Sequence, residues 1–144
     1  MEKEPETSVQ SASGHNMDIP IDWSVTSRYF EDEDTLMQVV GIFAEDSPQT
    51  VRDLAKAIQT QISQDVQLHA HSLKGASALI GAEHLRQRAW RLEYAAQEKN
   101  TAAFEALFDE TKAEFDKLMS FLYRADWIEA AKERHCNRQQ AEQV

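Results

Sequence analysis

The chain has 144 residues, enough for one hydrophobic core with extensions at both ends. Its formal net charge of -10 argues against a surface that binds nucleic acid or an anionic membrane. No apolar run approaches the roughly 20 residues of a membrane-spanning helix, and the first residues lack the basic and apolar regions of a signal peptide. The single cysteine, Cys136, excludes an internal disulfide and fits a reducing compartment, so we expect a cytoplasmic protein.

The two ends of the chain differ in pattern from its middle. Residues 1–18 are rich in Glu, Ser, Thr and Gln with little to bury, so we expect a disordered tail or a linker. The folded domain is expected over residues 19–125. It begins with a short helix that Asp22 is placed to cap and that should reach about Phe30. Residues 126–144 lose the apolar pattern and should form either an extra helix or a frayed extension.

The next predicted helix begins after Asp32, a capping residue followed by two acidic side chains. Its apolar residues recur at helical spacing: Leu36, Val39, Val40 and Phe43, then Val51, Leu54, Ala55, Ile58 and Ile62. Pro48 interrupts this run and would either kink one long helix or separate two. We favour a single bent helix because the apolar phase continues beyond the proline.

The central helix should begin at Ser63 or Asp65 and end at Gly81, a residue suited to a left-handed helix end. Its apolar stripe comprises Val66, Ala70, Leu73, Ser77 and Ile80. At about 100° of rotation per residue, His71 lies roughly 160° from the middle of that stripe. The imidazole should therefore face solvent.

Two further helices complete the pattern. Residues 83–97 place Leu85, Ala89, Leu92 and Ala96 on one side. Asn100 should stop this helix and Thr101 should cap the next, whose stripe comprises Phe104, Phe108, Thr111, Phe115, Leu118 and Leu122. Four long amphipathic segments with short connections predict an all-α fold, an antiparallel up-down-up-down four-helix bundle with a short N-terminal helix.

The surroundings of His71 suggest a chemistry. Gly75 lies one turn further along the predicted helix, where glycine costs about 1 kcal/mol relative to alanine, so it needs a reason. Clearance for a large group on His71, or for the backbone of a partner, is such a reason. Lys74 places a cation beside the ring. This combination suits an anionic adduct, for which phosphoryl is the natural candidate.

These residues form a recognisable motif. The run His71-x-Leu73-Lys74-Gly75-Ala76-Ser77, followed by Gly81-Ala82, Leu85 and Leu92-Glu93, resembles the signature of histidine-containing phosphotransfer (HPt) domains of bacterial phosphorelays. The similarity extends more loosely from about Ile21 to Leu122. It implies that His71 accepts a phosphoryl group from the aspartate of a receiver domain in a hybrid histidine kinase. The group would then pass to the aspartate of a response-regulator receiver domain.

The mechanism implied by this resemblance requires a neutral His71, because a protonated ring has no lone pair to attack phosphorus. Lys74 would disfavour the imidazolium form and offset charge on the phosphoryl oxygens. Glu93 matches a family position on the facing helix, where it would orient the ring. The alternative for Glu93 is an ordinary solvent-facing side chain. Apolar residues around His71, from the first short helix and the start of the second, should contact the partner.

The other histidines lead to no comparable site. His69 is rotated about 200° from His71, which predicts a packed boundary residue that cannot share a metal with it. His84 should lie at the surface. His135 and Cys136 have no second pair at a zinc-ligand spacing, so no metal site is expected.

Without a glycine-rich loop or a Walker-type lysine motif, the chain should be a phosphocarrier and not an enzyme that uses ATP. We expect a monomer with no cofactor, and the resemblance places the divalent metal on the partner receiver domain. A pure interaction module is the main alternative, and a general-base enzyme would lack a second catalytic group. The sequence fits either a free-standing protein or the C-terminal module of a hybrid kinase.

Overall fold

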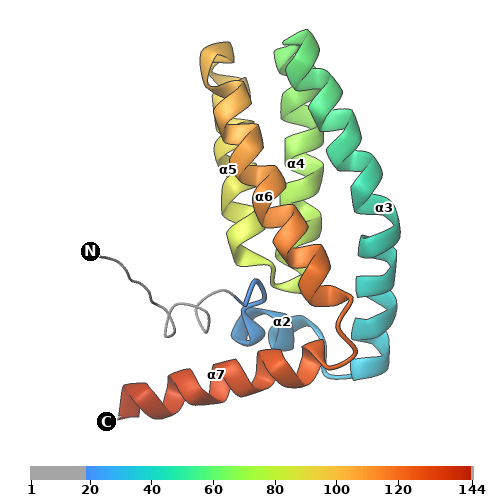
Figure 1. Cartoon of the computed structure of the whole chain (residues 1–144), viewed down its shortest axis with the longest axis vertical. Coiled ribbons are helices and arrows are strands. Elements are labelled where there is room, and N and C mark those ends of the chain that lie inside the picture. Colours follow the sequence, from blue (N-terminus) through green and yellow to red (C-terminus); the bar gives the residue numbers. More distant parts are fainter. Residues whose placement is uncertain (1–18, 144) are drawn as a thin grey trace, which may run out of the picture.

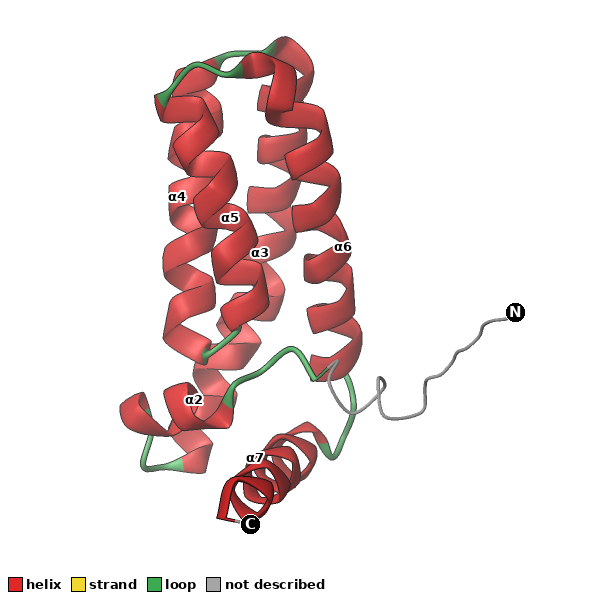
Figure 2. Ribbon diagram, turned by 90° about the vertical axis from the view of Figure 1, so that its left-hand side faces the viewer, coloured by secondary structure: helices red, strands yellow, loops and turns green. Residues whose placement is uncertain are grey.

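A computed structural model describes residues 19–143, together with the side chains up to residue 140. The expected tail, residues 1–18, lies outside this described part. Four long helices run alternately up and down: α3 (Glu33–Thr60), α4 (Ser63–Ile80), α5 (Glu83–Gln97) and α6 (Phe104–Leu122). Figure 1 shows them side by side along the long axis, and Figure 2 shows the same arrangement from the side. The predicted antiparallel four-helix bundle is confirmed, and residues 19–143 contain no strand.

Two further helices close one end of the bundle. Helix α2 (Trp23–Tyr29) packs beneath α4, and helix α7 (Trp127–Gln143) lies across the base next to α2 (Figure 1). Of the two alternatives for residues 126–144, an extra helix or a frayed extension, the described part shows the helix, which continues to Gln143. Its first turns are anchored, because Trp127, Ile128 and Ala131 are buried.

The core follows the predicted stripes, except that Ile62, expected in the stripe of α3, lies beyond that helix and is 47% exposed. All five stripe residues of α4 are buried: Val66, Ala70, Leu73, Ser77 and Ile80. The stripe of α5 is buried as well, and that of α6 is buried except for Phe108, which is half-buried. The hydroxyl of Ser77 donates to the carbonyl of Leu73 at 2.7 Å, which satisfies a polar group inside the core. Single helices of this length are marginal in water, so this shared core holds them.

The helix ends follow the sequence with one exception. Asp22 accepts from the backbone N–H of Ser24, and Asp32 from that of Asp34, as expected of capping residues. Pro48 lies inside α3, which remains one element, so the expectation of a continuous helix is confirmed. Thr101 does not cap α6. It begins a 3₁₀ turn, η1 (Thr101–Ala103), that leads into that helix.

Gly81 joins the site-bearing helix to the base of the bundle. It ends α4 with a φ of 80°, the left-handed conformation that we predicted. Its carbonyl accepts from the backbone N–H of Asp22 at 2.8 Å. The hydroxyl of Thr26 donates to the carbonyl of Ile80 at 2.8 Å, so α2 supplies a hydrogen-bond donor at the C-terminal end of α4. These contacts fix the axial position of the helix that carries His71.

Candidate functional site

The α4 helix presents His71 on the side opposite its buried stripe. The side chain of His71 is 66% exposed, so the prediction that the ring faces solvent is confirmed. The exposure follows from helix geometry, because Ala70 and Leu73 point into the core and the ring between them is rotated outward.

Glu93 approaches the ring from α5. Its Oε2 lies 2.7 Å from Nδ1 of His71, and its Oε1 lies 2.7 Å from Nζ of Lys74. The Glu93 side chain is only 8% exposed. The interpretation of Glu93 as an ordinary solvent-facing glutamate is therefore wrong. One buried carboxylate bridges the histidine and the lysine.

The two partners of Glu93 keep it ionised. Burial by itself raises the pKa of this carboxyl, but the hydrogen bonds from Lys74 and His71, together with the charge on Lys74, outweigh burial and lower the pKa below 4.5. An ionised carboxylate can only accept hydrogen bonds, so Nδ1 of His71 must donate. In a neutral imidazole the lone pair is then on Nε2, the ring nitrogen that Glu93 does not contact.

Lys74 lies closer to Glu93 than the sequence suggested. We expected Lys74 to place a cation beside His71, and in the structure its ammonium forms an ion pair with the buried carboxylate, with the Lys74 side chain 27% exposed. Its charge still lies within the His71 site because the same carboxylate binds both side chains. No local pattern in the sequence signals this pairing, which depends on the register between α4 and α5.

Gly75 leaves open space on the His71 side of α4. Apart from its two chain neighbours and the nearby backbone of its own helix, a Cβ atom added at Gly75 would meet no atom of the described chain within 4 Å. The glycine is also exposed. No contact within the described chain therefore requires glycine here, and the empty surface is available to a molecule that approaches His71.

The surface around His71 is shallow. An open hollow of about 430 Å³ is lined by Gln64, Gln67, Leu68, His71 and Glu93. It contains no enclosed pocket for a small substrate. Such a surface is suited to contact with another macromolecule.

On the other side of His71, towards α3, the surface is apolar. A groove of about 160 Å³ between α3 and α4 is lined by residues that include Val39, Ile42, Ala76 and Leu79. The side chains of Ile42, Leu68 and Leu79 are 58%, 59% and 44% exposed. These three residues were not among those predicted from the sequence to form a site. Their signal was present, since Leu68 and Leu79 are apolar but lie outside the buried stripe of α4.

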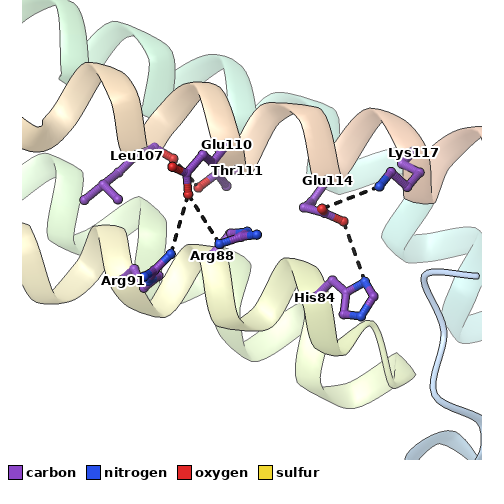
Figure 3. Close-up of polar contacts among 8 residues, drawn as sticks. All are labelled: His84, Arg88, Arg91, Leu107, Glu110, Thr111, Glu114 and Lys117. Atoms are coloured by element: carbon purple, nitrogen blue, oxygen red, sulfur yellow. Dashed lines mark hydrogen bonds and ion pairs between the residues drawn. The ribbon is translucent and has the colours of Figure 1, made fainter. Parts of the chain in front are cut away.

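The remaining histidines lie away from this arrangement. His69 is half-buried, and the side chain of His84 is half exposed with Nδ1 3.9 Å from Oε1 of Glu114 (Figure 3). In the described residues no group of three or more His, Cys, Asp or Glu side chains is arranged to hold a metal ion. Among the described helices, none is long and apolar enough to cross a membrane.

A four-helix bundle with an exposed histidine on its central helix is the arrangement that the family resemblance of the sequence predicts. The Hpt domain family model matches residues 38–121, more than half of the chain, and the chain belongs to this family. His71, Lys74, Gly75 and Glu93 all lie within the matched residues.

Two particular relatives place the chain within that class. It is 29% identical over 84 residues to histidine-containing phosphotransfer protein 1 of Arabidopsis thaliana, an alignment that covers 57% of this chain and 54% of the relative. The chain thus spans about half the length of that curated relative. It also resembles the crystal structure of histidine-containing phosphotransfer protein B of Pseudomonas aeruginosa PAO1, with a TM-score of 0.65 and 28% identity. That match covers 80% of this chain and 94% of the other.

Proposed function

We propose that this protein is a histidine phosphotransfer protein of a two-component phosphorelay and that His71 is its phosphoacceptor. The observation that carries the proposal is the position of the ring: it is 66% exposed, yet a buried carboxylate holds its Nδ1. A nucleophile that is accessible on one side and held by a hydrogen bond on the other is arranged for covalent transfer.

The proposed transfer begins at Nε2. Its lone pair attacks the phosphorus of an aspartyl phosphate in a receiver domain, a new N–P bond forms, and the acyl P–O bond breaks to release the aspartate carboxylate. The ring keeps its proton on Nδ1 and so gains a positive charge, which the Glu93 carboxylate offsets at 2.7 Å. Attack by the aspartate of a second receiver domain reverses these changes.

Lys74 has a second role in this proposal. In the free protein its ammonium pairs with Glu93, and the three phosphoryl oxygens compete for it once His71 is modified. A lysine is suited to this exchange because its ammonium is a compact charge on a flexible stem. Gly75 gives the phosphoryl group or the partner room one turn away.

The proposed partners are the receiver domain of a hybrid histidine kinase and that of a response regulator. Both would dock over His71 and the apolar groove between α3 and α4, where Ile42 and Leu79 offer exposed apolar contacts. We further propose a monomeric, cytoplasmic phosphocarrier without a cofactor of its own. The family resemblance assigns the divalent metal ion to the receiver domain.

The direct test is transfer from a phosphorylated receiver domain with a radioactive phosphoryl group. The native chain should acquire a label that is stable in alkali and labile in acid, as expected of a phosphorus–nitrogen bond. His71→Gln should abolish the label, whereas the matched control His69→Gln, two residues away on α4, should retain it. A label that persists in His71→Gln would refute the assignment. Receiver binding without any label would instead identify an interaction module.

A further inference from the structure

The outer face of α5 carries a positive charge that is unusual for this chain. Between Glu83 and Glu93 the sequence contains three arginines and no acidic residue, in a protein of net charge -10. Together with Trp90 these arginines line an open hollow of about 580 Å³. We name Arg86, Arg88, Trp90 and Arg91 the arginine face. It is separate from the hollow at His71, whose lining contains none of them.

The acidic residues of the bundle only partly neutralise this face. Nη1 of Arg88 and Nη1 of Arg91 lie 3.3 and 3.6 Å from the same oxygen, Oε1 of Glu110 on α6 (Figure 3). Two guanidinium groups thus share one carboxylate. The side chains of Arg88 and Arg91 are 37% and 52% exposed, so both can donate hydrogen bonds to a further anionic group from solvent.

Aromatic surface accompanies the charge. The side chains of Trp90 and Tyr94 stack with their ring centroids 6.0 Å apart, and they are 51% and 53% exposed. A stacked pair of this kind is a rigid apolar platform beside the guanidinium groups. The face is therefore suited to an acidic peptide segment with small apolar or proline residues between its charges.

The sequence of the chain contains an acidic segment close to its start. Glu2, Glu4 and Glu6 alternate with Lys3 and Pro5, so three carboxylates outnumber one ammonium, and we name residues 2–6 the acidic segment. It precedes the described part of the chain. The first described residue, Ile19, shares a small hollow with Glu83 and His84 at the beginning of α5. The chain therefore enters the described fold at the foot of the helix that carries the arginine face.

The lengths involved permit contact within one molecule. Arg88 and Arg91 lie about 6 to 11 Å beyond His84 along the helix axis, at 1.5 Å per residue. The thirteen residue-to-residue steps from Glu6 to Ile19 can span at most about 45 Å when fully extended. We propose that the acidic segment binds the arginine face of α5 in the same chain, through ion pairs with Arg88 and Arg91.

Paramagnetic relaxation in the full-length protein tests this proposal. A nitroxide label is attached at Ser8→Cys in a Cys136→Ser background, which removes the single native thiol. At low salt, the amide signals of residues 86–94 should lose more than half of their intensity. Replacing Glu2, Glu4 and Glu6 with Gln should restore this intensity at least twofold, and so should Arg88→Gln combined with Arg91→Gln.

The matched control is Lys112→Gln combined with Lys117→Gln, which removes two exposed cations from α6 and should leave the broadening of α5 unchanged. The proposal is overturned if α6 broadens as much as α5, or if the charge-neutralised segment broadens α5 equally. Mixing spin-labelled protein with separate isotope-labelled protein identifies contact between two copies. Broadening that appears fully in this mixture also overturns the proposal.

Discussion

Glu93 links the chemistry of the site to the stability of the bundle. Its carboxylate is buried, and its two close partners are His71 and Lys74. Their combined effect lowers the pKa of Glu93 even though burial opposes ionisation. Folding therefore stabilises the ionised form of the Glu93 carboxyl relative to its protonated form.

This difference predicts a pH dependence of stability. Because the folded-state pKa of Glu93 is lowered, the stabilisation is present above its unfolded value of about 4.5 and is lost as the pH falls through the folded value. Chemical denaturation of the native chain and of Glu93→Gln, from pH 7 down to pH 3, measures this contribution. The stability advantage of the native chain over the variant should shrink as the pH falls. A difference that does not change with pH would contradict the assignment.

Substitution of Gly75 should have opposite effects on the stability of the protein and on phosphoryl transfer. Alanine fits both Gly75 and Gly41, since neither position has an atom of the described chain within 4 Å of an added Cβ. Either substitution should raise the free energy of unfolding by about 0.5 to 1 kcal/mol through helix propensity. Only Gly75→Ala, on the His71 side of α4, should slow phosphoryl transfer from a receiver domain, by several-fold. Unchanged transfer in both variants would refute the clearance role.

At the scale of helices, the ends that depend on local chemistry were predictable. Asp22 and Asp32 cap the helices that follow them, and Gly81 ends α4. The entry to α6 was not predictable in this way. The chain reverses through Lys99, which has a φ of 57°, and then uses Thr101 in a 3₁₀ turn. In the sequence, a threonine before an apolar run is compatible both with a helix-capping residue and with the start of a 3₁₀ turn.

Gly81 is the helix end on which the position of His71 most depends. Its φ of 80° disfavours any residue with a Cβ, and that atom would also lie 3.0 Å from the backbone of Asp22 and Thr26. Gly81→Ala should therefore lower the free energy of unfolding by about 1 to 3 kcal/mol, the usual cost of a strained backbone position. Urea denaturation measures this loss. An unchanged denaturation midpoint would show that α2 does not lock α4 at this point.

At the scale of the whole molecule, the bundle was predictable because four apolar stripes require one common core. The site was predictable only in part. Helix periodicity places His71 and Gly75 at the surface, but the bridge formed by Glu93 depends on how α4 and α5 align. The position of α7 depends on side chains that no local pattern connects, such as Trp127, which packs edge-on against Phe121 with centroids 6.2 Å apart.

Trp127 allows the base of the molecule to be tested apart from the site. The residue is 2% exposed, so Trp127→Ala should lower the free energy of unfolding by about 3 to 5 kcal/mol. Because His71 is carried by α4 and held by α5, transfer by the folded variant at low temperature should remain within twofold of the native rate. Thermal denaturation and transfer kinetics on one preparation give both values. A large loss of transfer in fully folded protein would show that α7 contributes to the site.

The proposed phosphoryl transfer depends on one nitrogen atom of one ring. Two-dimensional ¹H–¹⁵N NMR of the phosphorylated, ¹⁵N-labelled protein distinguishes the two ring nitrogens of each histidine. We expect one phosphohistidine, at His71, with the phosphoryl group on Nε2 and the proton on Nδ1, where Glu93 accepts it. Phosphate on Nδ1 of His71, or on any of the other histidines, would contradict the proposed mechanism.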